Sequence, residues 1–366
     1  MKTRTRILTA IPIILLLLLV VACGQNSNDA TTSQPAANQP GTPSAAPAPE
    51  APKPEEPKKD PNIVGTDKFP TKDIEFVVPY NPGGGYDTWA RGFAEFSKKY
   101  LPEDVNVVVS NKPGGAGRSG TSAIYRARPD GYTIGIAELL LAGPQIVLGP
   151  DEIGFDLRKF TWIGQFVADP YVVAVSTKSG INSMADLKAK GQVRWGLATI
   201  SAPDMITIDI YDIDASFVSG FGGIPEQIAA LSRGDVDMVA AGANSLYKFV
   251  ESGEIKPILS TYHERAALYP DAPTIKEETG ENTSFAVQRT IAGPPGIPAE
   301  EKQVLEDLFN KVTNDADFQA WVKEKNYNLD AANSAELTES VNILMDSLDK
   351  YKDSFVPVLK DQLSNQ

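Results

Sequence analysis

The chain has 366 residues and a formal net charge of −13, with a single cysteine and a single histidine. Such an acidic protein repels nucleic acid and anionic lipid surfaces, which argues against a nucleic-acid-binding protein. One cysteine excludes an intrachain disulfide and a thiolate metal cluster, and one histidine leaves at most one imidazole for catalysis or metal binding. We therefore expect no metal site and no cofactor.

Residues 1–22 have the pattern of a signal peptide. Three basic residues precede a 15-residue apolar run from Ile7 to Val21, and Val20-Val21-Ala22-Cys23 closes it. The run is shorter than the roughly 20 residues of a bilayer-spanning helix, so an uncleaved membrane anchor is the weaker alternative. Small residues before Cys23 form a lipobox, which predicts that its thiol is acylated in the mature protein. Cleavage removes three positive charges and moves the net charge from −13 to −16.

Residues 23–67 are predicted to be a lipidated N-terminus followed by a disordered linker. This stretch consists mainly of Gln, Asn, Ser, Thr, Ala, Pro, Glu and Lys and has few large apolar side chains. Such a composition cannot bury a core, and its prolines favour extended backbone. A small folded subdomain is the alternative.

The remaining part of about 300 residues exceeds the size that one core usually supports, so two lobes are expected. Helix-like segments alternate with strand-like runs, which predicts α/β lobes with largely parallel sheets. The strand-like runs are residues 74–79, 105–109, 132–137, 162–167, 171–176, 194–198, 215–219, 236–240 and 255–260.

The first glycine-rich loop follows a strand-like run that ends at Pro79. Gly83, Gly84 and Gly85 precede Tyr86 and an Asp-Thr pair that opens a helix. Glycines let backbone N–H groups approach a ligand closely, and a helix N-terminus carries a partial positive charge. The loop is therefore a candidate cradle for a small anion, with a simple strand-to-helix turn as the alternative.

A second glycine cluster has the spacing Gly115-x-Gly117-x-x-Gly120, which matches the dinucleotide-binding fingerprint, and Glu138 lies near the expected acidic position. These glycines do not follow the first strand of the chain, and an exported protein meets little intracellular NAD. We interpret them as a turn whose bare backbone allows close packing or lines a cleft.

Other enzyme signatures are missing from the sequence, including the Gly-x-Ser-x-Gly elbow and the Walker loop. Ser119 and Ser201 lie beside small residues, but a serine triad needs His263, which falls in a polar stretch and is interpreted as a solvated loop histidine. The sequence therefore predicts a protein that is not an enzyme. An exported hydrolase or a dinucleotide enzyme is the alternative from another functional class.

Near the C-terminus, apolar residues recur at three- and four-residue spacing, which predicts a helix that packs an apolar stripe on a core. These residues are Leu337, Val341, Leu344, Met345, Leu348 and Tyr351.

Several motifs in order resemble those of the tripartite tricarboxylate transporter substrate-binding proteins, also called the Bug family, over residues 69–366. The first three are Val78-Pro-Tyr-Asn-Pro-Gly-Gly-Gly-Tyr-Asp87, Asn111-Lys-Pro-Gly-Gly-Ala-Gly117 and Pro129-Asp-Gly-Tyr-Thr133. Leu231-Ser-Arg-Gly-Asp-Val-Asp237, Pro270-Asp-Ala-Pro-Thr-Ile-Lys-Glu277 and Gly293-Pro-Pro-Gly-Ile-Pro298 follow. Each motif is weak alone, and their order and spacing carry the resemblance.

The resemblance implies a two-lobed periplasmic-binding-protein-like α/β fold with a ligand cleft between the lobes. Residues 69–167 plus 290–366 would form lobe 1 and residues 168–289 lobe 2, with crossings near 166–169 and 285–291. The implied function is capture of a small organic acid and its delivery to membrane permease subunits by a monomeric, lipid-anchored protein outside the cytoplasm. A lipoprotein that reports its ligand to a sensor kinase is the alternative.

The resemblance also assigns ligand contacts to both lobes. In lobe 1 they are Tyr80, Asn81, Pro82, Gly83, Gly84, Gly85, Tyr86 and Asp87, of which Asp87, with Thr88, is also expected to cap the helix. In lobe 2 they are Ala198, Thr199, Ser201, Ser219, Phe221 and Gly222. Glu138 and Asn244 are further candidates at the rim of the cleft.

Two departures from the family pattern leave the ligand open. Relatives carry a Pro-Tyr-Lys-Gly type sequence where this chain has Ser219-Gly-Phe-Gly222, so a lysine is missing, and the loop after Ala198 lacks the usual glycine-rich run. Arg289 is then the candidate partner for a distal carboxylate, with an ordinary surface or interlobe arginine as the alternative.

The aromatic residues Tyr80, Tyr86, Trp195 and Phe221 indicate that an aromatic acid could stack between the lobes, although each could equally pack in a core. An aliphatic di- or tricarboxylate, an aromatic acid and an amino acid therefore all remain candidate ligands.

Overall fold

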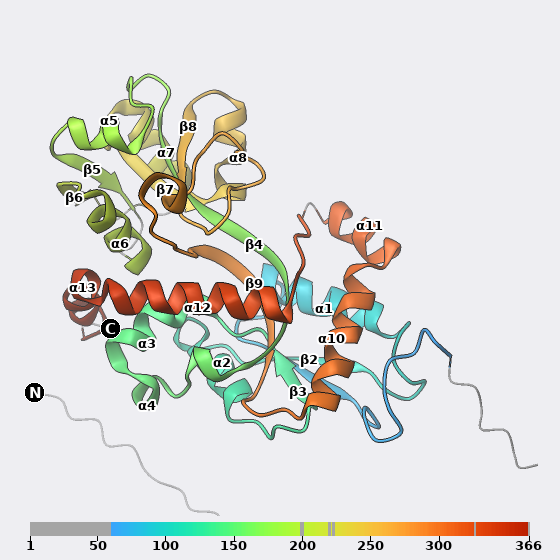
Figure 1. The fold of residues 1–366 in the computed structure, drawn as a ribbon. Helices are drawn as coiled ribbons and strands as arrows, with labels where there is room; N and C mark the ends of the chain where they lie inside the picture. Colours follow the sequence, from blue (N-terminus) through green and yellow to red (C-terminus); the bar gives the residue numbers. More distant parts are fainter. Residues whose placement is uncertain (1–59, 198–200, 219–220, 222–223, 326, 365–366) are drawn as a thin grey trace, which may run out of the picture. The chain divides into compact units, whose positions relative to one another are not determined.

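The computed structural model describes residues 60–197, 201–218, 221, 224–325 and 327–364, and its strands join in one mixed sheet (Figure 1). The strand order along the main path is β2-β1-β3-β9-β4-β7-β5-β6, and β8 and β10 pair with β4 beside it. The strands are β1 (Ile74–Val78), β2 (Val107–Asn111), β3 (Thr133–Gly135), β4 (Thr161–Ser176), β5 (Val193–Gly196), β6 (Ala215–Val218), β7 (Met238–Gly242), β8 (Ile255–Ser260), β9 (Ala286–Gly293) and β10 (Ala332–Asn333).

Strand β4 connects two groups of strands. Residues 161–170 pair antiparallel with β9 and β10, whereas residues 171–176 pair antiparallel with β7 and β8. We call the part built on β1, β2, β3, β9 and β10 the first lobe and the part built on β5, β6, β7 and β8 the second lobe. Figure 1 shows β4 and β9 running between them. The predicted chain crossings between the lobes, near 166–169 and 285–291, lie on β4 and at β9. The residue limits given for the two lobes remain a prediction.

The expectation of largely parallel sheets is wrong. Parallel pairing joins β1 to β2 and β3, and β5 to β6 and β7, but every pair made by β4 is antiparallel, and so is the β3–β9 pair. The reason is that β4 and β9 cross between the lobes in opposite directions. The sequence predicted two separate strands here, with a break at Asp169-Pro170. In the structure one strand continues through these residues and changes its pairing partners there.

Helices cover the sheet in both lobes (Figure 1). They are α1 (Gly85–Ser97), α2 (Arg118–Tyr125), α3 (Ala142–Leu148), α4 (Pro150–Ile153), α5 (Met184–Ala189), α6 (Ala202–Tyr211), α7 (Ile224–Arg233), α8 (Ala243–Glu251), α9 (Ile275–Thr279), α10 (Ala299–Thr313), α11 (Ala316–Glu324), α12 (Ser334–Lys350) and α13 (Lys352–Ser364). Short 3-10 turns are η1 (Gly115–Gly117), η2 (Leu139–Leu141) and η3 (Leu157–Lys159).

The first lobe has two apolar cores, which include aromatic residues. In one core, Trp89 of α1 stacks on Phe166 of β4 with ring centroids 5.2 Å apart, and α10 and α11 close around them. The other core lies under α2, α3, α12 and α13. It buries the predicted α12 stripe, from Leu337 to Leu348, so that expectation is confirmed.

The N-terminal predictions lie mostly outside the described residues. These include the signal peptide of residues 1–22, the acylated Cys23 and the linker as far as residue 59. At the end of the predicted linker, Val64 is buried and its N–H donates to the Tyr100 carbonyl at 2.7 Å. The folded unit therefore begins before residue 68. Among the described residues, no helix has the length and apolar character needed to span a membrane.

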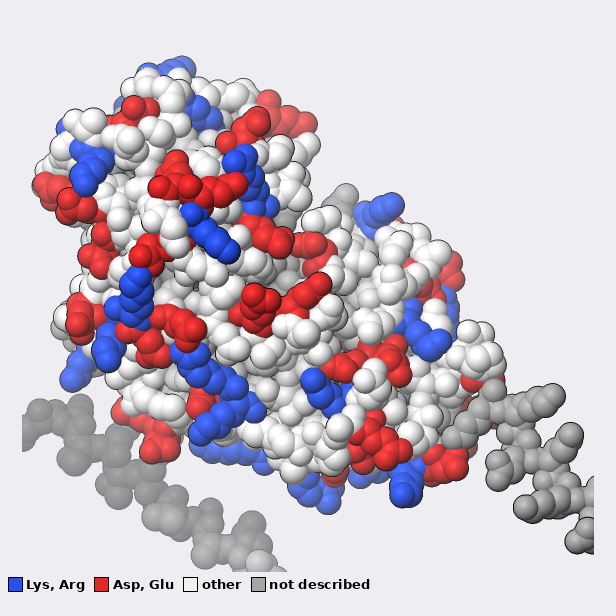
Figure 2. Space-filling model, viewed as in Figure 1, with Lys and Arg blue, Asp and Glu red and all other residues white. Residues whose placement is uncertain are grey.

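Charged side chains of both signs intermingle over the face that Figure 2 shows, on both lobes. This face therefore has no large patch of one sign.

Candidate functional site

The glycine loop, residues 82–85, leads from β1 into α1 and is held by one carboxylate. The side chain of Asp87 accepts from the Gly83 N–H at 2.9 Å, from Asn111 Nδ2 at 2.9 Å and from Arg91 Nε at 2.8 Å. Burial acts to raise the pKa of Asp87, but the bonds from Arg91, Gly83 and Asn111 outweigh it and hold this pKa below its usual value. Asp87 therefore holds the loop, but it accepts from Gly83, before the N-cap residue Gly84, which has no side-chain cap hydrogen bond, so the prediction that Asp87 caps α1 is wrong.

Thr88 does not cap the helix either. Its hydroxyl donates to the Gly84 carbonyl at 3.0 Å instead of accepting from the first N–H groups of the helix. The prediction that Thr88 caps α1 is wrong, and Gly84 itself is the N-cap residue.

Beside the glycine loop, Tyr80, Tyr86, Glu138 and Arg289 form a group that we call the polar cluster. Tyr80 Oη donates to Glu138 Oε2 at 2.7 Å, and the rings of Tyr80 and Tyr86 lie 4.7 Å apart between centroids. The Arg289 guanidinium lies 4.9 Å from the centroid of the Tyr86 ring. A Cβ added to Gly85 would be 3.7 Å from Arg289 Nη2, so this arginine faces the glycine loop.

Glu138 is the buried acid of the polar cluster and not a rim residue as predicted, because only 1% of its surface is exposed. Burial raises its pKa, against the opposing effects of hydrogen bonds from the Leu140 N–H, Tyr80 and Tyr86 and of the charge on Arg289. Burial and then the nearby Glu138 raise the pKa of both tyrosines, so each remains a neutral donor. Among the described residues, none of the ion pairs includes Arg289.

A cavity of about 560 Å³ adjoins the polar cluster and takes its walls from both lobes. It meets the cluster at Ala116, which lines the cavity and whose carbonyl accepts from Tyr80 Oη at 3.2 Å. The lining residues are Ala116, Leu139, Leu140, Ala142, Gly143, Pro144, Tyr171, Leu197, Ser201, Ala202, Pro203, Asp204, Ile224, Gln227, Ala240, Ala241, Gly242, Ser245, Ser284, Phe285, Ala286, Val287, Leu344, Leu348 and Leu359. None of residues 80–87 is among them.

Asp204 is the one acidic side chain among these lining residues. It forms a capping box with Ser201 at the start of α6, in which its carboxylate accepts from the Ser201 N–H at 3.0 Å and from the Ser201 hydroxyl at 2.7 Å. Burial raises the pKa of Asp204 to about 6, against these two hydrogen bonds. Ser201 thus lies at the cavity as predicted, with its hydroxyl engaged by Asp204.

The second-lobe candidates have different positions. Ala198, Thr199, Ser219 and Gly222 lie outside the described residues. The Asn244 side chain is exposed, while its N–H donates to the buried Asp169 at 2.9 Å, and its neighbour Ser245 lines the cavity.

The possible aromatic cage is not formed. Trp195 is 1% exposed within one second-lobe core, and Phe221 packs against another. Tyr80 and Tyr86 are the two predicted aromatics that lie together, because both flank the glycine loop.

The second glycine cluster serves close packing, as we interpreted it. A Cβ on Gly120 would lie 2.5 Å from Pro79 Cα, so α2 can approach the end of β1 only without a side chain there. Gly117 has φ of +98°, and a Cβ there would be 3.1 Å from Glu138 Cβ.

His263 lies in a loop, as predicted, but it is half-buried rather than fully solvated. Its Nδ1 lies 3.2 Å from the hydroxyl of Ser284, a side chain with no exposed surface, and burial lowers the pKa of His263. Among the hydrogen bonds of the described residues, His263 pairs with Ser284 and with neither Ser119 nor Ser201, so the serine triad considered from the sequence is not formed there.

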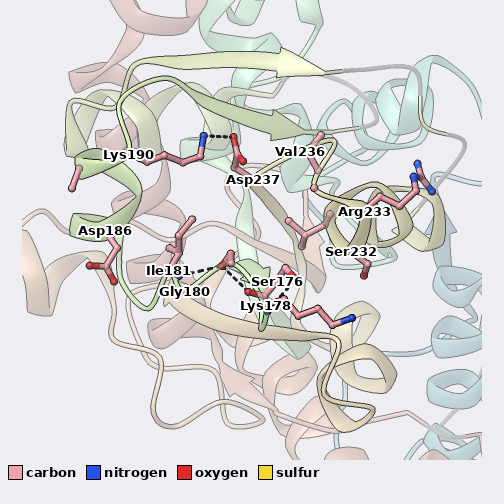
Figure 3. A pocket seen from close by; sticks show the side chains of 14 residues that line it. Ser176, Lys178, Gly180, Ile181, Asp186, Lys190, Ser232, Arg233, Val236 and Asp237 are labelled. Carbon is pink, nitrogen blue, oxygen red and sulfur yellow. Dashed lines mark hydrogen bonds and ion pairs between the residues drawn. The ribbon is translucent and has the colours of Figure 1, made fainter.

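A second hollow, which we call the second-lobe groove, measures about 710 Å³ (Figure 3). Its lining comes from residues 176–190 and 231–237 of the second lobe, including Lys178, Lys190 and Arg233. Lys190 Nζ lies 3.2 Å from Asp237 Oδ2, the pair joined by a dashed line in Figure 3. Although larger, this hollow draws on one lobe, and its Lys190 and Asp237 pair with each other.

The sequence did not predict several cavity residues, notably Leu139, Leu140 and Leu359. Leu344 and Leu348 were predicted only as part of a core-facing stripe. In the sequence, that stripe was the signal that pointed to this wall. The other wall residues come from η2 and α13, and only the three-dimensional fold places these elements next to α12.

The sequence matches a family model described as "Tripartite tricarboxylate transporter family receptor" over residues 90–353. Among curated relatives, the "UPF0065 protein in gbd 5'region" of Cupriavidus necator is 28% identical over 260 residues, which cover 67% of this chain and 76% of that protein.

Solved structures show the same fold. A TctC solute-binding protein from Polaromonas is 22% identical with a TM-score of 0.66, covering 77% of this chain and 99% of its own. An R. palustris protein with adipate has 19% identity and a TM-score of 0.54, covering 78% and 98% of the two chains. MatC from Rhodopseudomonas palustris, with bound malate, has 20% identity and a TM-score of 0.51, covering 78% and 99%. The chain therefore has the two-lobed α/β fold of periplasmic binding proteins, as the sequence resemblance implied.

Proposed function

Because the chain belongs to the receptor family of tripartite tricarboxylate transporters, we propose that it captures a small carboxylate between its lobes and delivers it to a membrane permease of that type. The family consists of solute-binding receptors that act outside the cytoplasm and is not an enzyme family. That membership supports binding without chemistry. Two relatives of the same fold hold adipate and malate, which supports a carboxylate as the ligand.

The observation that carries this proposal is the position of Arg289 against the glycine loop, next to a cavity that both lobes line. A ligand carboxylate at residues 83–85 would meet glycine backbone, the N-terminus of α1 and a guanidinium without an ion-pair partner among the described residues. The body of the ligand would then extend past Ala116 into the cavity. The predicted contacts from Tyr80 to Tyr86, together with Arg289, belong to this proposal.

The second-lobe contacts are proposed to come from the two segments that precede α6 and α7. Both follow the carboxyl ends of parallel strands, β5 and β6, which is where open α/β sheets bind their ligands. Their neighbours Leu197, Ser201 and Ile224 line the cavity, which supports this assignment. A ligand that touches both lobes stabilises the closed form by its higher affinity for that form.

We also propose that the mature monomer is held at the outer face of the cell membrane by a lipid on Cys23. The lipobox and the linker composition support this anchor. Mass spectrometry of the mature N-terminus is expected to find Cys23 acylated, and Cys23→Ser is expected to release the protein from membranes. An unmodified Cys23 in the membrane-bound protein would contradict the anchor.

A ligand screen tests the central proposal. Thermal unfolding of the mature chain carrying Cys23→Ser is followed with mono-, di- and tricarboxylates and aromatic acids. A ligand at a hundredfold excess over its Kd stabilises the folded state by about 2.7 kcal/mol, so a true ligand raises the melting temperature. A shift with sugars or nucleotides, and none with any carboxylate, would overturn the proposal.

A further inference from the structure

We propose that the ligand is a monocarboxylate with an extended apolar tail, and that η2, α12 and α13 form the wall that receives this tail. The inference rests on the proposed function, because it assumes that one carboxylate binds at the polar cluster. It adds the chemical class of the rest of the ligand.

The charge of the cavity supports a single carboxylate. Among the described residues that line it there is no lysine, arginine or histidine, and the one carboxylic acid is the buried Asp204. The segments 198–200, 219–220 and 222–223 also contain no basic residue in sequence. A second carboxylate in this space would lose its hydration and gain no cation, which is strongly unfavourable. Arg289 is the one cation at the adjoining polar cluster.

The neighbouring buried acids make a second ligand carboxylate still less favourable. Besides Asp204, the buried Glu138 lies in the polar cluster. Asp169 lies next to Gly242, since a Cβ added to Gly242 would be 2.3 Å from Asp169 Oδ2. The charge of Arg289 acts on both Glu138 and Asp169. One ligand carboxylate would therefore already compete with two protein acids for this guanidinium.

Much of the cavity wall is apolar. Leu344 and Leu348 come from α12, Leu359 from α13, and Leu139 and Leu140 from η2. Leu140 lines the cavity and keeps 47% of its surface exposed, which leaves apolar area for a ligand to cover.

Helix α13 is fixed in this position by contacts with both lobes. Phe355 and Leu359 join the core cluster that contains Ala142 of α3 and Ile206 of α6, and Ser354 Oγ donates to Asp209 Oδ2 of α6 at 2.6 Å. The family match ends at residue 353, so nearly all of α13 follows the matched region. The end of the chain thus supplies a wall that the family motifs do not describe.

Isothermal titration of the Cys23→Ser mature chain with matched acids tests the inference. Butanoate, hexanoate and octanoate are compared with succinate, adipate and suberate, which have the same carbon numbers. We expect the Kd of the monocarboxylates to fall about fourfold for each added methylene, from the transfer free energy of a buried CH2, and each dicarboxylate to bind more weakly than its monocarboxylate partner.

A variant of the wall distinguishes tail binding from general hydrophobic attraction. Leu140→Gln removes apolar surface at a half-exposed position, and Leu268→Gln is its control, since Leu268 is 41% exposed and lies outside the cavity lining. We expect Leu140→Gln to weaken octanoate about tenfold and to leave butanoate within twofold, and Leu268→Gln to change neither.

Failures of the two proposals give different results. Tighter binding of the dicarboxylates, or equal loss of octanoate and butanoate in Leu140→Gln, would overturn the apolar tail and leave carboxylate capture intact. Absence of binding by every mono-, di- and tricarboxylate would overturn the proposed function itself.

Discussion

The interlobe cavity and the second-lobe groove are both hollow, but their charged groups behave in opposite ways. In the groove Asp237 is paired with Lys190, as Figure 3 shows, and also with Arg194, which lies outside the groove lining. In the cavity the hydrogen-bond partner of Asp204 among the described residues is Ser201, and the cation nearby, Arg289, faces the glycine loop. The groove is formed by one lobe, whereas a ligand in the cavity contacts both and can favour closure. The smaller hollow is therefore the better candidate site.

The largest expected effect comes from Gly120 of α2, which packs against Pro79 just before the polar cluster residue Tyr80. In Gly120→Ala, the new Cβ would meet the backbone of Pro79 at 2.5 Å, so β1 and α2 must separate. We expect the free energy of unfolding to fall by about 3 kcal/mol, as in other overpacked sites, with loss of ligand binding. Chemical denaturation measures the first effect and calorimetry the second.

Gly234→Ala is the matched change in the groove. Its Cβ would meet nothing within 4 Å, and only the φ of +80° opposes it, so a loss of about 1 kcal/mol is expected with binding unchanged. Equal losses of stability in the two variants would contradict the contrast between cavity and groove.

The pH dependence of stability distinguishes the two aspartates by sign. Burial raises the pKa of Asp204 to about 6, so between pH 4 and 6 the folded state keeps a proton that the unfolded state releases. The free energy of unfolding therefore falls as pH rises through this range, by on the order of 2 to 3 kcal/mol. In Asp204→Asn this fall should disappear from urea unfolding curves measured from pH 4 to 7.

Asp237 has the opposite behaviour. Burial acts to raise its pKa, but the bonds from Arg194 and Lys190 outweigh it and lower this pKa. Its contribution to stability is present above the unfolded pKa and is lost as pH falls through the folded pKa. Asp237→Asn should therefore lose stability at neutral pH and change little in acid. The same sign of pH dependence in both variants would refute the contrast.

The polar cluster gives the next effect. Arg289→Ala removes the cation that faces the glycine loop, and a charge-assisted hydrogen bond to a carboxylate is worth about 1.5 to 3 kcal/mol. We expect affinity for the best carboxylate ligand to fall about 30-fold by calorimetry. Arg233→Ala, in the groove, should leave the Kd within twofold. A loss in Arg233→Ala as large as in Arg289→Ala would remove the reason to prefer the cavity.

Much of the fold was predictable because local patterns report it directly. Glycine spacing predicted the close approach at Gly120, the α12 stripe predicted a buried face, and the ordered motifs predicted the family. At Asp169-Pro170 local reasoning failed, because a proline usually ends a strand, and here the strand continues while its pairing partner changes.

The cavity wall was not predictable for a different reason. Leu140 and Leu359 are far apart in sequence, and each has an ordinary local pattern, so only tertiary packing shows that they line one space. Glu138 was a candidate because it lies near the end of a strand-like run. Its burial, however, depends on Tyr80 and Tyr86, which come from another segment of the chain. Convergence of distant side chains leaves no periodic signal in the chain.

The smallest expected effect belongs to the groove. Lys190→Ala removes one half-exposed ion pair, and Asp237 keeps its bond to Arg194 at 2.8 Å, so the free energy of unfolding should change by less than about 0.5 kcal/mol. Lys188→Ala, which breaks an exposed pair with Asp212, is the control of similar size. Ligand affinity should stay within twofold in both. A tenfold loss of ligand affinity confined to Lys190→Ala would mean that the groove is coupled to ligand binding. The contrast between the cavity and the groove would then fail.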